Sequence, residues 1–72
     1  MSATRKLYRE IATSISYQVK AAGDEKDILH TIAAVTRAVA DDLKRDNSAF
    51  LYHRFFEAAG LDEFGYPPKV KS

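Results

Sequence analysis

Histidine is the side chain best suited to acid–base chemistry near neutral pH, and the chain contains two, His30 and His53. A catalytic histidine needs a nucleophile and an orienting acid within hydrogen-bond reach. Helical spacing instead puts His30 on a polar face near Arg37 and Asp41, and His53 beside Glu57 on another. No H-E-x-x-H sequence and no glycine-rich phosphate loop is present. The sequence therefore predicts two surface histidines, no catalytic residues, no enzymatic activity and no cofactor.

Two acidic groups, 24-DEKD-27 and Asp41-Asp42, are the only candidates for a cation site. Neither has the alternating oxygen ligands and central glycine of a calcium loop. The first group fits the start of a helix, and the second can pair with Arg37 and Arg45 at helical spacing. The chain has no cysteine, which excludes thiolate metal sites and disulfides. We expect no bound metal.

Basic residues gather on one side of the first helical segment. Arg5, Lys6, Arg9 and Lys20 fall within an arc of about 100° opposite its apolar residues. Arginine and lysine are the side chains that hold phosphate groups. However, the net charge is only +1 and the isoelectric point is about 8.0, which is far from the basic extreme of a typical DNA-binding domain. A DNA-binding regulator that uses Arg5, Arg9 and Lys20 is thus an alternative hypothesis, and a solvated face is the simpler interpretation.

The size of the chain sets a limit on its stability. With 72 residues, of which 46% are hydrophobic and 29% charged, it has the composition of one folded domain. A chain this short buries only about 60% of the surface that its unfolded form exposes. Self-association is one way for such a small domain to gain stability. The charged N-terminal segment lacks the apolar stretch of a signal peptide, and no run of about 18 apolar residues could span a membrane. We therefore expect a cytoplasmic protein.

Apolar residues recur with the period of a helix in three segments, which predicts an all-α protein. The first stripe spans about 140° at 100° per residue. It comprises Leu7, Tyr8, Ile11, Ala12, Ile15, Val19 and Ala22. The second comprises Ile28, Leu29, Ile32, Val35, Val39 and Leu43. If one helix ran through both segments, the stripes would be offset by about 80°, so a turn between them is favoured.

The expected ends of the helices follow from capping residues. Ser2 or Thr4 can start the first helix, and Gly23 can end it. Asp24 is expected to cap the second helix. The third is expected to start after 46-DNS-48 and to stop at Gly60, with Leu61 completing a Schellman ending. Together these signals predict a small three-helix bundle.

The domain is expected to span residues 1–61, and residues 62–72 to form an extended tail because they contain Pro67-Pro68.

Aromatic and apolar side chains are in excess in the third helix. They cover an arc of about 160°, wider than the roughly 100° that packing on a hairpin needs. Leu51, Tyr52, Phe55, Phe56, Ala58 and Ala59 form this arc, and the tail adds Phe64, Tyr66 and Val70. Either the tail folds back over the excess surface or another chain covers it. In the second case, the expected contact residues are Tyr52, Phe56, Phe64 and Tyr66.

The segment 38-AVADDLKRDNSAFLYHRFFEAAGLDE-63 resembles the C-terminal half of small uncharacterised proteins of actinobacteriophages. The shared pattern is D-N-x-x-F followed by R-F-x-x-A-x-G-L, present here as Asp46, Asn47, Phe50, Arg54, Phe55, Ala58, Gly60 and Leu61. Such proteins often have a proline where this chain has Ser48. The resemblance covers about a third of the chain and implies a phage-encoded accessory protein that works inside a bacterial host. It brings no known activity.

The sequence as a whole favours a non-enzymatic module that binds another protein. A homodimer is the favoured assembly, because it would add stability to a small domain and bury the excess of apolar surface.

Overall fold

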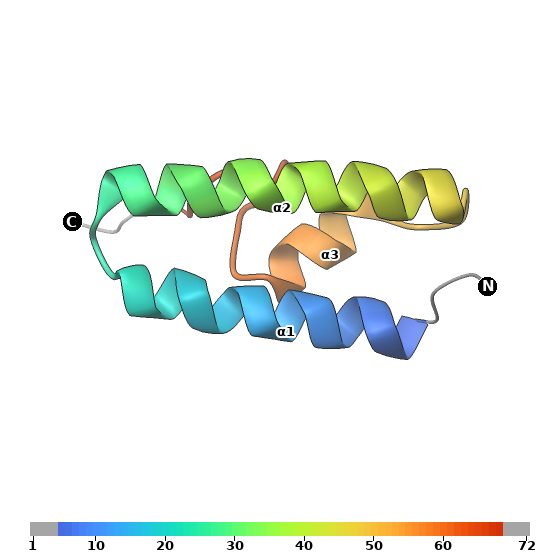
Figure 1. The fold of residues 1–72 in the computed structure, drawn as a ribbon, viewed down its shortest axis with the longest axis horizontal. Coiled ribbons are helices and arrows are strands. Elements are labelled where there is room, and N and C mark those ends of the chain that lie inside the picture. Colours follow the sequence, from blue (N-terminus) through green and yellow to red (C-terminus); the bar gives the residue numbers. More distant parts are fainter. Residues whose placement is uncertain (1–4, 69–72) are drawn as a thin grey trace.

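The computed structural model describes residues 5–68, which form three helices and no strand. Helix α1 spans Arg5–Ala22, α2 spans Lys26–Asp46, and α3 spans Tyr52–Ala58 (Figure 1). The prediction of an all-α, three-helix protein is confirmed. The predicted caps of α1, Ser2 and Thr4, lie outside the described residues, as does the end of the tail from residue 69 onward.

Helices α1 and α2 form an antiparallel hairpin, as predicted (Figure 1). The chain reverses at Gly23, whose φ of 59° lies in the left-handed region that favours glycine. Its N–H donates to the carbonyl of Lys20 at 3.2 Å. The predicted cap of α2 was one residue too early, because Glu25 and not Asp24 occupies the N-cap, and its side chain makes no capping bond. Asp27 lies in the first turn of α2 as expected, where the helix dipole favours an anion.

The start of α3 differs from the prediction, because residues 46–48 do not cap α3: Asp46 is the last residue of α2, and Asn47 is the C-cap of α2. Asn47 Oδ1 accepts a hydrogen bond from the N–H of Ala49 at 3.0 Å, and this closes a local turn. Asn, Asp and Ser satisfy backbone groups in turns as readily as at helix ends. The helix begins only at Tyr52, with Leu51 as its N-cap residue.

A lysine side chain of α2 holds the connection between α2 and α3 in place. Lys44 Nζ donates to the carbonyl of Ser48 at 2.8 Å and to that of Phe50 at 3.0 Å. These charge-assisted bonds hold Phe50 in a non-helical position from which its ring points into the core, with 5% of the residue exposed.

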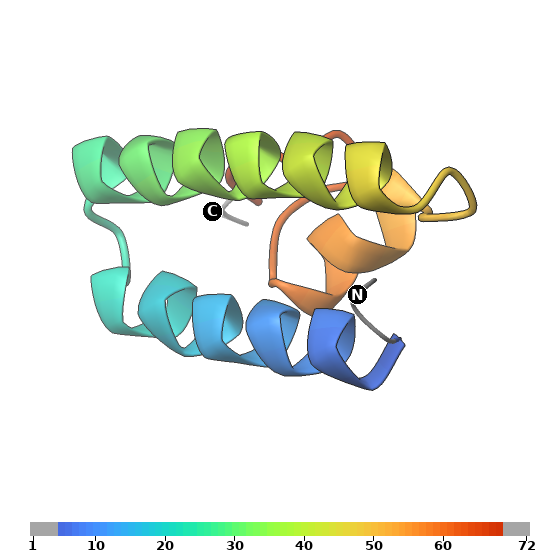
Figure 2. The ribbon, with the colours of Figure 1, turned by 45° about the vertical axis from the view of Figure 1, so that its right-hand side comes forward.

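Aromatic rings from three parts of the chain make up the centre of the core. The Phe50 ring lies 5.2 Å from that of Tyr8 on α1, at an interplanar angle of 89°, and 5.4 Å from that of Phe55 on α3. Edge-to-face pairs of this kind are favourable beyond the area they bury. Small residues line the places where the helices approach one another. These are Ala12, Ala33, Ala40 and Ala59, each at most 1% exposed. Figure 2 shows that α3 lies between the N-terminal half of α1 and the C-terminal half of α2.

The predicted Schellman ending of α3 is confirmed. The N–H of Leu61 donates to the carbonyl of Phe56 at 3.0 Å, and the N–H of Gly60 donates to that of Glu57 at 3.0 Å. Gly60 has a φ of 86°, and Leu61 is buried. The chain is thereby turned back toward α2.

Residues 62–68 do not extend away from the domain but fold back against α2. Asp62 Oδ1 accepts the N–H groups of Phe64 at 2.9 Å and Tyr66 at 3.0 Å, which closes a compact loop. Arg37 Nη1 donates to the carbonyl of Gly65 at 2.8 Å, and its guanidinium lies 4.3 Å from the centre of the Tyr66 ring. The tail thus covers Phe56, which is part of the excess aromatic surface, whereas Phe64 and Tyr66 of the tail stay exposed.

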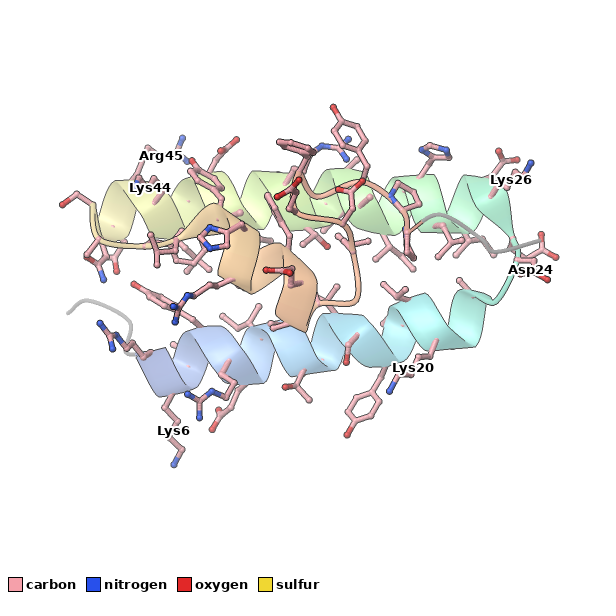
Figure 3. The ribbon with its side chains drawn as sticks, turned by 180° about the vertical axis from the view of Figure 1, so that it is seen from behind. Lys6, Lys20, Asp24, Lys26, Lys44 and Arg45 are labelled. Atoms are coloured by element: carbon pink, nitrogen blue, oxygen red, sulfur yellow. The ribbon has the colours of Figure 1, made fainter. Side chains whose placement is uncertain are left out.

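Helix α3 and the tail lie on the same side of the hairpin. The segment from residue 61 onward passes behind α2 in Figure 1 and in front of it in Figure 3, which is seen from the opposite side. Gly60 lies beside α1, where an added Cβ would be 3.6 Å from Val19, and Gly65 lies beside α2, where an added Cβ would be 2.8 Å from Arg37. The other side of the hairpin has no covering layer among residues 5–68.

Candidate functional site

The ring of Phe56, one of the four expected contact residues, belongs to the core. It is 5% exposed and packs against Tyr52, at 5.9 Å between ring centres, and against Phe55 at 6.2 Å. Gly65 of the tail lies so close to this ring that an added Cβ would be 2.9 Å from two of its atoms. The expectation that this ring is free for a partner is therefore corrected, because the folded-back tail covers it.

Tyr52 is half-buried and held in place by polar contacts with α2. Its hydroxyl donates to Asp41 Oδ1 at 2.9 Å, and Lys44 Nζ lies 5.9 Å from the centre of its ring. The hydrogen bond to Asp41, together with desolvation and the negative charge of that carboxylate, raises the pKa of Tyr52 above its ordinary value. Asp41 was expected to pair with Arg37, but Arg37 instead binds the tail.

The two remaining expected contact residues, Phe64 and Tyr66, lie on the surface of the tail. Phe64 is 68% exposed and Tyr66 is 50% exposed. The loop that Asp62 closes fixes both positions, so the rings are presented from an ordered segment.

A second apolar surface lies on the uncovered side of the hairpin, and the sequence did not indicate it. We call it the open face. Val35 is 57% exposed, Ile28 50% and Leu7 43%, although all three belong to stripes that were expected to be buried. Val35 is two residues from Arg37, so the two side chains point about 160° apart around α2. Since Arg37 holds the tail, Val35 faces the opposite side.

The open face continues across both helices of the hairpin. It is hollowed by a depression of about 210 Å³ between α1 and α2. The depression is lined by Ile15, Gln18, Thr31, Ile32, Val35 and Thr36. Thr36 is fully buried there, and its hydroxyl donates to the carbonyl of Ile32 at 2.7 Å, so it leaves no unsatisfied polar group in this apolar surface.

The basic residues of α1 separate into two groups. Arg5 and Arg9 line a cleft of about 490 Å³ where the N-terminal half of α1 faces α3 and the connection that precedes it. Lys20 lies in the last turn of α1, about 22 Å further along the helix axis than Arg5. Figure 3 shows the corresponding separation of Lys6 and Lys20 at opposite ends of α1. The three predicted nucleic-acid contacts are therefore not brought together.

Arg54 joins Arg5 and Arg9 in this cleft. In the sequence, Arg54 stands out only as part of the R-F-x-x-A pattern, because nothing in either helix alone shows that α3 docks beside the start of α1. The remaining lining residues are Tyr8, Ala12, Asn47, Ala49, Phe50, Leu51, Phe55 and Ala58. Five residues of the D-N-x-x-F and R-F-x-x-A pattern thus form the wall of the cleft.

The other candidates for chemistry stay apart. His30 and His53 are both exposed, as predicted. Asp42 pairs with Arg45, as predicted. Within residues 5–68, no three His, Asp or Glu side chains are grouped so that they could hold a metal ion. None of the three helices is long and apolar enough to cross a membrane.

Comparison of the chain with protein-family models, with curated proteins and with solved structures found no match. Its function must therefore be argued from its own residues.

Proposed function

We propose that this protein is a non-enzymatic protein-binding module that pairs with a second copy of itself through the open face of the hairpin. The proposal rests on the uncovered apolar side of the hairpin, where Ile28 and Val35 are exposed beside the depression between α1 and α2. From the resemblance of residues 38–63 we further propose that it is a phage-encoded accessory protein acting in the cytoplasm of a bacterial host.

The spacing of apolar residues on the open face of α2 supports a helical partner. Ile28, Ile32, Val35 and Val39 are separated by four, three and four residues. This alternation is the pattern that forms the seam between packed helices, and β-branched residues at such positions favour pairing. Asp42 falls at the next position and pairs with Arg45, so the apolar seam ends near the last turn of α2.

The area of the open face is sufficient for a dimer. Helix α2 is about 31 Å long and the two helices of the hairpin together are about 20 Å wide, which gives roughly 600 Å² on each chain. Two such faces would bury roughly 1,200 Å², above the limit of about 1,000 Å² for a specific interface. Two hairpins packed face to face would make a four-helix bundle, a common solution for amphipathic helices.

The tail residues Phe64 and Tyr66 lie on the other side of α2 and would stay accessible in this dimer. They are the surface that we propose for a different protein partner, since exposed aromatic side chains are enriched at protein interfaces. The alternative of a DNA-binding regulator that uses Arg5, Arg9 and Lys20 has less support, because Lys20 lies far from the two arginines.

Sedimentation equilibrium tests the proposed dimer. The wild-type protein should sediment as a dimer at micromolar concentration, and its melting temperature should rise with protein concentration. Val35→Lys should give a monomer with an unchanged helical circular dichroism spectrum, because it puts a charge in the centre of the open face. Ala34→Lys is the matched control, since Ala34 is exposed and lies about 100° away around α2.

A wild-type monomer at high micromolar concentration would refute the proposal. It would also fail if Val35→Lys and Ala34→Lys had the same sedimentation behaviour.

A further inference from the structure

Three positive charges surround the cleft between α1 and α3. Arg5 and Arg9 are four residues apart and therefore neighbours on one side of α1, and Arg54 comes from α3. None of the residues that line the cleft is acidic. Within residues 5–68, none of the three arginines makes an ion pair. The cleft thus holds a concentration of uncompensated positive charge in a chain whose net charge is only +1.

This charge is unfavourable for helix α1 itself. The N-terminus of a helix carries the positive end of its dipole, where acidic side chains are stabilising. The first described turn of α1 contains Arg5 and Lys6 and no acidic residue. Helix α2 obeys the rule at both ends, with Asp27 in its first turn and basic residues in its last. A local rule that one helix breaks while its neighbour obeys it is typical of a functional position.

The hydroxyl of Tyr8 is buried without a partner in a residue that lines the cleft. Tyr8 lines the cleft and is 8% exposed, and its hydroxyl is the one buried side-chain polar atom without a hydrogen-bond partner in the described part of the chain. Leaving such a group unsatisfied costs about 1–3 kcal/mol of stability. The hydroxyl oxygen is closed off from solvent, so a ligand in the cleft could satisfy it only if the Tyr8 side chain moved.

We propose that this cleft binds the phosphate group of a small molecule, held by Arg5, Arg9 and Arg54. Arginine presents a planar set of donors that matches phosphate oxygens, and a phosphate monoester carries close to two negative charges near neutral pH. The volume of about 490 Å³ is within the range of small-molecule sites. The apolar side chains of Leu51 and Phe55 in the lining can contact the organic part of such a ligand.

An extended nucleic acid fits this arrangement less well. A polyanion needs cations spread along a track, and its affinity depends on the number of phosphates that they neutralise. Here three arginines line a single cleft, while Lys20 is about 22 Å away along α1. The positive charge is therefore arranged for one anionic group.

Titration followed by the amide chemical shifts in NMR spectra tests the proposal at constant ionic strength. The probes are inorganic phosphate, adenosine monophosphate and adenosine. Both phosphates should shift the amides of residues that line the cleft, and adenosine should not. Equal affinities would identify free phosphate as the ligand, and tighter binding of the monophosphate would identify a phosphorylated small molecule.

Variants of the cleft provide the controls. Arg9→Gln and Arg54→Gln should each weaken phosphate binding at least tenfold, because each removes a charge-assisted hydrogen bond. Lys20→Gln changes the net charge by the same amount outside the cleft and should leave the affinity unchanged. Tyr8→Phe removes the unpartnered hydroxyl and should leave phosphate binding unchanged, because that oxygen is closed off from the solvent in the cleft.

Several results would overturn this proposal. One is adenosine binding as tightly as its monophosphate, and another is an equal loss of affinity in Lys20→Gln and Arg54→Gln. A duplex oligonucleotide that binds more tightly than the monophosphate and depends on Lys20 would also overturn it, in favour of a nucleic-acid interface.

Discussion

Gly65 holds the tail against the hairpin, and its replacement by alanine is the most direct test of the folded-back tail. Its φ of 82° is a conformation that residues with a side chain rarely adopt. An added Cβ would lie 2.8 Å from Arg37 Cγ and 2.9 Å from two atoms of the Phe56 ring. Gly65→Ala therefore combines backbone strain with a steric clash, and either the core shifts or the tail is released.

The cost of releasing the tail sets the upper limit of this effect. The Arg37 hydrogen bond to the carbonyl of Gly65 contributes about 1 kcal/mol, and the contact of Arg37 with the Tyr66 ring about 0.5–1 kcal/mol. Uncovering roughly 60 Å² of the Phe56 ring would cost about 1.5 kcal/mol. We therefore expect Gly65→Ala to lower the free energy of unfolding by up to about 3–3.5 kcal/mol, and the melting temperature by up to roughly 12–28 °C for a domain of this size.

Gly23→Ala is the matched control, because Gly23 also has a positive φ, 59°, but an added Cβ would meet nothing within 4 Å. It should cost only the conformational term, about 1 kcal/mol. Both variants should be compared by urea denaturation at one protein concentration, and the tail should become sensitive to proteolysis only in Gly65→Ala. If Gly65→Ala were no more destabilising than Gly23→Ala, the tail would not pack as described.

Two further variants test the aromatic positions. Phe56→Asp should unfold the domain, because it removes a core ring worth about 3–5 kcal/mol and leaves a buried charge. Phe64→Asp on the exposed tail should change the free energy of unfolding by less than about 0.5 kcal/mol. Thermal denaturation of both variants measures the difference. Equal effects would contradict the placement of Phe56 in the core. The pKa of Tyr52 is higher in the folded state than in the unfolded state. The hydroxyl therefore stabilises the fold fully at a pH below its unfolded-state pKa, and this stabilisation is lost as the pH rises through its folded-state pKa. Tyr52→Phe should therefore lose less stability than wild type when the pH rises above about 10, as measured by urea denaturation; the same loss in both proteins would refute the bond to Asp41.

Much of the fold follows from local signals in the sequence. The period of the apolar residues and the position of Gly23 were enough to predict α1, α2 and the hairpin. The ending of α3 at Gly60 and Leu61 was also predicted, because a Schellman motif depends only on neighbouring residues. The start of α3 was not, because residues 46–48 suit a turn as well as a cap, and the outcome depends on Lys44.

The features that depend on contacts between distant segments were not predicted. Arg37 looked like a partner for Asp41, and only the path of the tail shows that it binds Gly65. The stripe of α2 was correctly located, yet Val35 is exposed, because α3 and the tail cover only one side of the hairpin. Likewise, Arg54 joins Arg5 only through the docking of α3.

The ring contact between Tyr8 and Phe50 also has a consequence for the time course of folding during synthesis. The two residues lie at opposite ends of the sequence that forms the hairpin, so Tyr8 must wait for its partner until α2 has been made. At a translation rate of about 5–20 residues per second, this delay is a few seconds, far longer than the microseconds in which a helix forms. The hairpin is complete only once Asp46 has been made, and α3 ends 12 residues later, so the hairpin has both of its apolar sides exposed for about 0.6–2.4 s. In this interval the chain is most open to chaperones and proteases.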